Sequence, residues 1–144
     1  MTSVDEIVAF LSKVPLFHDL KDAQLRKLAK HLREREYAAD EVILEQGKHG
    51  VGLFVMVLGE AKVVRTQIDG TVFELDRLHR TDFFGELSLL DESPRSASVI
   101  TVTPTKCLAL EKLLFLDEIS SDPEMAVAML KTLAQRYRRL IQNM

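Results

Sequence analysis

The middle of the chain, from Tyr37 to Glu111, consists of short apolar and β-branched runs of strand length, and this pattern constrains the fold most. Glycine or proline separates nearly every pair of runs, and Gly59 and Asp69-Gly70 are typical of tight turns between antiparallel strands. Short strands at this spacing favour a sandwich or a small barrel. The predicted strands are Val42–Leu44, Leu53–Leu58, Ala61–Thr66, Val72–Leu78, Ala97–Val102 and Lys106–Leu110.

Helical periodicity replaces this pattern at both ends of the chain. Apolar residues three and four apart predict two helices before the strands and two after them, the last with Pro123 in its first turn. The predicted helices are Val4–Leu11, Leu20–Glu36, Lys112–Ile119 and Met125–Gln142. At 144 residues and 47% hydrophobic, we expect one domain over 1–144, with N-terminal helices in 1–36, a β-roll in 37–111 and C-terminal helices in 112–144.

One helical turn, Gly85–Leu90, interrupts the strands, and its surroundings suit a phosphate. Gly85 permits a sharp turn or a close approach, and the unpaired amides of a helix start favour an anion. Arg95 carries a planar fork of donors that matches two phosphate oxygens, and Glu86 can accept from a sugar hydroxyl. A structural ion pair between Glu86 and Arg95 is the ordinary alternative, but the residues around them favour binding of a small, sugar-linked phosphate.

The run from Phe84 to Val99 resembles the phosphate-binding cassette of the cyclic-nucleotide-binding domain family. That pattern has Phe-Gly-Glu, a few small or apolar residues, a loop, then Pro-Arg, a small residue, Ala, Ser or Thr, and Val. The similarity continues through Phe10–Phe17, Glu45–Gly47 and Val57–Val63. This chain departs from the pattern at two positions outside the cassette: Lys48 replaces a common acidic residue, and Thr81 replaces a common glycine.

The resemblance implies a mainly β fold with flanking helices. The expected form is an antiparallel β jelly roll or barrel with N-terminal helices, one short phosphate-binding helix and C-terminal lid helices. It also implies that the amides of Ser88 and Ser96 face the phosphate, and that Gly85 and Glu86 meet the ribose 2′-hydroxyl. The residues expected to bind the ligand are Gly85, Glu86, Leu87, Ser88, Arg95, Ser96 and Ala97.

The implied function is that of a regulatory sensor rather than an enzyme. It binds cyclic AMP or cyclic GMP, with cyclic AMP favoured, as a ligand rather than a cofactor. Binding would close the C-terminal helices over the site, with Leu89 relaying the movement. Because an unpaired arginine against apolar walls would be poorly solvated, we expect the loop around Arg95 to stay open and hydrated until a phosphate binds.

Two alternatives to this function stay open. The first is a catalytic or metal-binding, cupin-like jelly roll, although the four histidines are scattered and suggest no metal site. The second is the sensor part of a transcription regulator without its DNA-binding domain. The role of Arg136–Arg139 is also open, because this run is either a solvated helix end or the source of a lid residue. For a sensor, we expect an effector domain or a partner protein to carry the response to the ligand. The last helix could also pair two copies of the chain into a homodimer.

The remaining composition narrows the partners and the compartment. A formal charge of −3 gives no net basic field, so neither nucleic acid nor a membrane is expected as a partner. The single cysteine, Cys107, lies in an apolar run and is expected to be buried and inert. The glycine-rich run Gly47–Gly52 is expected to be a loop between strands rather than a phosphate cradle. Because the sequence shows neither a signal segment nor an apolar run of membrane-spanning length, we expect a cytoplasmic protein.

Overall fold

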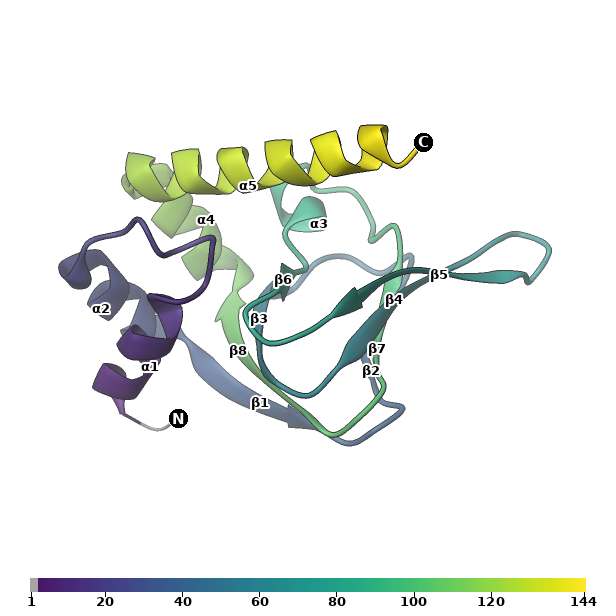
Figure 1. Cartoon of the computed structure of the whole chain (residues 1–144), viewed down its shortest axis with the longest axis horizontal. Helices are drawn as coiled ribbons and strands as arrows, with labels where there is room; N and C mark the ends of the chain where they lie inside the picture. Colours follow the sequence, from purple (N-terminus) through teal and green to yellow (C-terminus); the bar gives the residue numbers. More distant parts are fainter. Residues whose placement is uncertain (1–2) are drawn as a thin grey trace. The chain divides into compact units, whose positions relative to one another are not determined.

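The computed structural model describes residues 3–144, which divide into two compact units (Figure 1). The helical unit comprises residues 3–31 and Leu116–Met144, and the β unit comprises Leu32–Phe115. Among the described residues, none of the helices combines the length and apolar character needed to cross a bilayer.

The β unit contains two four-stranded antiparallel sheets. The first has the order β1-β8-β3-β6 and the second the order β2-β7-β4-β5. The long β4–β5 hairpin extends away from the rest of the unit (Figure 1). The strands are β1 (Arg33–Tyr37), β2 (Val42–Leu44), β3 (Gly52–Leu58), β4 (Ala61–Thr66), β5 (Val72–Leu78), β6 (Phe83–Phe84), β7 (Ser98–Thr101) and β8 (Thr105–Glu111).

The two sheets share one hydrophobic core, to which each contributes four buried side chains. Phe54 and Phe84 stack in it with their ring centroids 5.3 Å apart. Burial of these apolar side chains is the main stabilising contribution to the unit. The first sheet supplies Phe54, Met56, Phe84 and Cys107, and the second supplies Leu44, Ala61, Leu78 and Val99.

The predicted fold class, mainly antiparallel β with flanking helices, is confirmed. The predicted helix Leu20–Glu36 is wrong at its end, because the helix stops at His31 and Arg33–Tyr37 forms strand β1. The N-terminal helical segment therefore ends before residue 36. Alternating charges in Arg33–Glu36 give no apolar strand pattern, and pairing with β8 across five residue positions determines the conformation there.

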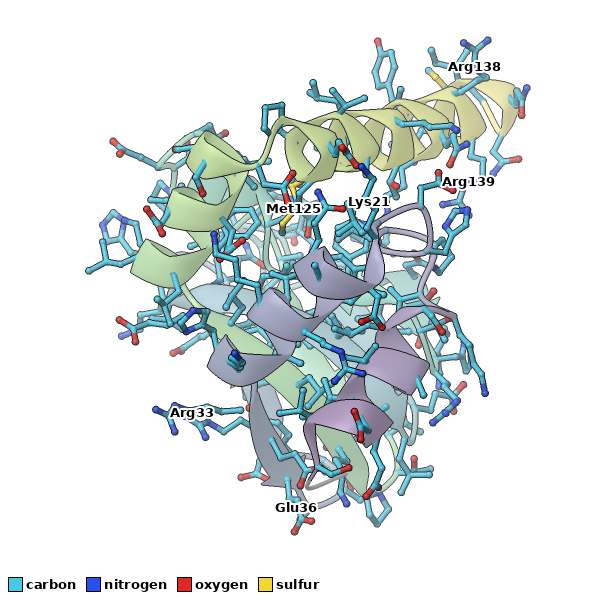
Figure 2. All side chains as sticks on the ribbon, turned by 90° about the vertical axis from the view of Figure 1, so that its left-hand side faces the viewer. Lys21, Arg33, Glu36, Met125, Arg138 and Arg139 are labelled. Atoms are coloured by element: carbon cyan, nitrogen blue, oxygen red, sulfur yellow. The ribbon has the colours of Figure 1, made fainter. Side chains whose placement is uncertain are left out.

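The helical unit is joined by polar contacts as well as by buried apolar residues. Its helices are α1 (Val4–Leu11), α2 (Asp22–His31), α5 (Pro123–Gln142) and the end of α4 (Lys112–Ser121), which begins in the β unit. Arg26 on α2 donates to Asp5 on α1 at 2.7 Å. Figure 2 labels Met125, a fully buried residue in the first turn of α5, together with Arg138 and Arg139, which project from different sides of its C-terminal end.

Candidate functional site

Gly85 turns the chain from strand β6 into the short helix α3 (Leu87–Leu90). Its φ is +93°, and a Cβ atom built there would lie 2.6 Å from the carbonyl oxygen of Gly52. Both of the uses expected for this glycine, a left-handed backbone and a close approach, are therefore confirmed. A larger residue here would move the start of α3 away from β3.

Helix α3 begins with donors that it does not use itself. The Glu86 carbonyl accepts from the amides of Leu89 and Leu90 at 3.1 and 3.0 Å. The amides of Leu87 and Ser88 precede these first helical donors, so they have no acceptor within the helix. The Ser88 side chain is only 6% exposed, and its hydroxyl has no hydrogen-bond partner among residues 3–144.

Glu86 places a carboxylate at the same point, immediately before α3. Its side chain is 3% exposed, and it does not cap the helix. A carboxylate in this position can accept hydrogen bonds but cannot donate them when ionised. It would repel a phosphate, but it can accept a hydrogen bond from a neighbouring sugar hydroxyl.

Arg95 follows the loop after α3 and is the least satisfied cation in the described part of the β unit. Its Nε and Nη2 atoms are both buried and have no hydrogen-bond partner among the described residues. Burial lowers the pKa of the Arg95 guanidinium from its ordinary value, although the group still carries its charge at neutral pH. The edge of the guanidinium that these two atoms form is buried, and the open, hydrated loop expected in the absence of a phosphate stays a prediction.

The same observation decides against a structural ion pair. Arg95 makes no ion pair with any carboxylate that the structure describes, Glu86 included. Nε and Nη2 are the two parallel donors along one edge of a guanidinium, the arrangement that meets two oxygens of one phosphate. A bound phosphate would satisfy both atoms at once.

One loop touches both halves of the site. Arg95 donates its amide to the Lys48 carbonyl at 2.9 Å, and its own carbonyl accepts from the Gly47 amide at 2.9 Å. Three residues along the chain, a Cβ atom built on Gly50 would lie 2.5 Å from Ser88 Oγ. The predicted loop between strands covers Gly47–Val51, and Gly52 already begins β3. This loop packs against the candidate site.

The sequence did not predict this contact between the loop and Arg95. Val42 pairs with Ile100 and Leu44 with Val99 in the β2–β7 ladder, and the contacts of Gly47 and Lys48 with Arg95 continue that register. This contact could be predicted only by knowing that β2 and β7 are neighbours in the sheet. Their separation of nearly fifty residues leaves no local pattern to detect.

The other predicted site residues lie around the same turn. Ser96 is exposed, and its carbonyl accepts from Arg65 Nη1. Ala97 is half-buried, Leu87 is exposed and Leu89 is fully buried. The structure thus gathers all seven predicted residues on the turn before α3, on α3 and on the loop that follows it, all within the β unit.

The arrangement suits recognition of a phosphate ester. It combines the buried donors of Arg95 and Ser88 with the first amides of α3, which have no acceptor within the helix, and with one buried carboxylate, Glu86. Within residues 3–144, no three histidine, cysteine or acidic side chains come together as a metal site would require. Cys107 is buried, as predicted, and burial raises the pKa of its thiol to about 12.

Known proteins share both the sequence and the fold. The model of the cyclic nucleotide-binding domain family matches residues 34–122. The CRP-like cAMP-activated global transcriptional regulator of Mycobacterium tuberculosis is 28% identical over 98% of this chain, which covers 62% of that protein. The cAMP-dependent protein kinase regulatory subunit of Aspergillus fumigatus is 39% identical over 71% of this chain, which covers 24% of that protein.

A solved structure extends the comparison to the fold. The catabolite activator protein of Thermus thermophilus is 33% identical and has a TM-score of 0.82, over 90% of this chain and 61% of that one. The chain therefore spans about three fifths of the M. tuberculosis regulator and of the T. thermophilus protein, and about a quarter of the kinase regulatory subunit. Because the family model covers well over half of the residues and includes the whole cassette around Arg95, the chain belongs to the cyclic nucleotide-binding domain family.

Proposed function

We propose that this protein binds a cyclic nucleotide as a regulatory sensor and catalyses no reaction on it. The observation that carries the proposal is the buried edge of Arg95, whose Nε and Nη2 atoms have no hydrogen-bond partner within residues 3–144. A buried charge without a partner is costly, and a monoanionic cyclic phosphate would supply both the counter-charge and two acceptors. Membership of the family makes a cyclic nucleotide the natural source of that phosphate.

The rest of the site is assigned around this contact. The amides of Ser88 and Ser96 bind the phosphate oxygens, with Leu87 and Ala97 completing the pocket on either side. Gly85 and Glu86 bind the ribose, with the Glu86 carboxylate accepting from the 2′-hydroxyl. Support for this arrangement comes from the burial of Glu86 at the start of α3, next to donors that an anion would occupy.

Cyclic AMP is the favoured ligand, and cyclic GMP is the second candidate. The two relatives compared by sequence are both named for cyclic AMP. Ser96 places a hydroxyl beside Arg95, where it could also serve a guanine base. We therefore propose cyclic AMP on the strength of the relatives and leave the base to direct titration.

The proposal is tested by calorimetric titration of the purified protein with both cyclic nucleotides. Arg95→Ala should cost on the order of 2–5 kcal/mol of binding free energy, a loss of roughly 30-fold to several thousand-fold in affinity, because it removes the charge partner. Arg33→Ala, an exposed arginine on β1 of the same unit, is the matched control and should bind like the wild type. A folded wild type that binds neither nucleotide, or an Arg95→Ala variant that binds normally, contradicts the proposal.

The same titration distinguishes the contact with the sugar from the contact with the phosphate. Glu86→Gln should weaken cyclic AMP more than its 2′-deoxy analogue, because only the ribose offers the hydroxyl that the carboxylate accepts. Equal losses for both ligands would remove Glu86 from the sugar contact while leaving the phosphate contact intact.

Ligand binding is proposed to act through the C-terminal helices and a second copy of the chain. The helices from Lys112 onward close over the base, and an effector domain or partner protein receives the signal. This is a population shift, driven by the contacts that only the closed state makes with the ligand. The relatives are longer proteins, which supports an output outside the span compared here.

The surface of α5 supports pairing with a second copy. Exposed residues recur along this helix at alternating spacings of three and four, which is the a and d pattern of a coiled coil. This a/d stripe consists of Val127, Leu130, Ala134, Tyr137 and Ile141 on α5, together with Met144 just beyond its C-terminal end. The five larger side chains of the stripe are at least half exposed, so a second stripe could bury them.

Charge along the stripe favours a parallel pair. Lys131 and Arg138 occupy the two e positions, and Leu133 and Leu140 occupy the g positions. In an antiparallel pair the basic e positions would face each other, whereas in a parallel pair each faces an apolar g position. We therefore expect two copies to associate side by side with their C-termini together.

A further inference from the structure

Gln46 is tied to the end of strand β4 by its side chain. Its Nε2 donates to the Thr66 carbonyl at 3.0 Å, and its Oε1 accepts from the Thr66 amide at 2.8 Å. The two bonds reproduce the pairing of one backbone residue with another, so they fix both the position and the plane of the amide group.

The backbone of the same residue leads directly to Arg95. The Gln46 amide donates to Ser98 Oγ at 2.8 Å, and the next two residues, Gly47 and Lys48, exchange backbone hydrogen bonds with Arg95. A second contact, from Arg65 Nη1 to the Ser96 carbonyl, ties the following residue to the same strand. The chain on both sides of the Arg95 side chain is thus anchored to the end of β4.

The side chain of Arg95 has no comparable support. Since Nε and Nη2 have no partner in the described part of the chain, the direction of the guanidinium depends on where its backbone is held. A bidentate contact with phosphate tolerates little angular error. An anchor that acts through the backbone would therefore matter more here than at an arginine fixed by its own hydrogen bonds.

We propose that Gln46 is a positioning residue that holds Arg95 in the geometry in which it binds phosphate. This inference rests on the proposed function. A glutamine is suited to the role because one planar group both donates and accepts, whereas a glutamate at position 46 could only accept. The ordinary alternative is a half-buried loop residue that satisfies its own polar groups and affects stability alone.

Two measurements, together with the thermal unfolding of the same variants, separate a positioning role of Gln46 from a purely structural one. The variants are Gln46→Ala, Gln46→Glu and the control Gln67→Ala, an exposed glutamine whose backbone closes the nearby hairpin turn. Amide hydrogen exchange by NMR, without ligand, reports whether the anchor holds the loop. Calorimetric titration with cyclic AMP, at a temperature where every variant is folded, reports whether the anchor matters for binding.

In Gln46→Ala we expect the Gly47 and Arg95 amides to exchange at least about tenfold faster, with the β3 amides unchanged, because only the loop is released. We expect affinity for cyclic AMP to fall by about tenfold, the equivalent of one or two hydrogen bonds. Gln46→Glu, which keeps one bond, should lie between Gln46→Ala and the wild type, and Gln67→Ala should match the wild type.

Each contrary result has a distinct meaning. Unchanged exchange at Gly47 and Arg95, or faster exchange with unchanged affinity, overturns the positioning role while the proposed function stands. A lower thermal midpoint as the sole effect gives Gln46 a structural role and likewise overturns the inference. A wild type that binds no cyclic nucleotide overturns the proposed function, and the inference with it.

Discussion

Thr81 has a backbone conformation that its residue type seldom adopts. Its φ is +77°, and it is the third residue of a turn in which the Asp82 amide donates to the His79 carbonyl at 3.0 Å. A turn with positive φ at this position suits glycine, and a β-branched residue there is strained. This explains why a glycine is common here in the pattern that the sequence resembles. The Thr81 amide donates to Met56 on β3, which prevents the turn from relaxing.

Thr81→Gly should therefore stabilise the protein. Removing Cβ relieves roughly 1–2 kcal/mol of left-handed strain, and the greater freedom of glycine in the unfolded chain offsets part of this, so we expect a net gain of about 0.5–1 kcal/mol. Thermal and urea unfolding would measure the gain. Thr71→Gly, at an exposed residue without positive φ, is the control and should lose stability; a loss at Thr81 as well would contradict the strain.

At the scale of elements, the start of α5 is fixed by one side chain. Asp122 accepts from the Met125 amide at 3.4 Å as the N-cap and from Gln24 Nε2 on α2, at 3.1 Å to each carboxylate oxygen. Four residues earlier, the buried Glu118 lies 3.7 Å from Lys27 Nζ, also on α2. The N-terminal and C-terminal helices are thus joined by two polar contacts as well as by their buried side chains.

Asp122→Ala should remove both the cap and the contact with α2. The expected loss is about 1–2 kcal/mol in the free energy of unfolding. A lost N-cap costs about 1 kcal/mol, and each further hydrogen bond contributes a similar or smaller amount. Urea unfolding followed by circular dichroism would measure it. Asp117→Ala, an exposed acidic residue on α4, is the matched control, and an equal effect of both substitutions would show that the cap does not matter.

The helices and strands that could be predicted are those whose conformation is specified by residues nearby in the sequence. β4 and β5 were predicted at their exact bounds, because the Asp-Gly turn and the apolar runs beside it specify a hairpin by themselves. β1 was missed because its charged residues become a strand only through pairing with β8, which lies about seventy residues away. Strand β6, only two residues long, was missed because it is too short to show any period.

The same distinction holds for the site in the whole molecule. The cassette of Gly85, Glu86 and Arg95 is contiguous, so its residues could be identified from sequence, although their roles stay predictions. The buried and unpartnered state of Arg95, and its anchoring by Gln46, depend on the neighbouring positions of β2, β4 and β7. No local pattern carries that information. The prediction of a single domain also stays a prediction.

Closure of the C-terminal helices can be followed by hydrogen exchange over the full chain. With saturating cyclic AMP, we expect slower amide exchange in residues 85–96, which include α3, and in residues 116–144, because the ligand favours the closed state. Arg95→Ala at the same ligand concentration is the control and should show little change. Protection confined to 85–96 would support binding and contradict the lid.

Association through the a/d stripe of α5 is a property of two molecules. Analytical ultracentrifugation should detect a dimer of the wild type, and Leu130→Glu should shift it to monomer, because a charge would be buried in the seam. Gln135→Glu, on an exposed and non-seam position of the same helix, should leave the dimer intact. A wild type that stays monomeric at high concentration would exclude this pairing.

The buried edge of the Arg95 guanidinium has a consequence for how such a receptor would behave with and without its messenger. A messenger that binds these atoms in the folded chain alone stabilises the fold by mass action. Under the proposed function, the unliganded form would be the more readily unfolded and degraded one. The cellular level of the receptor would then rise and fall with the messenger that it detects.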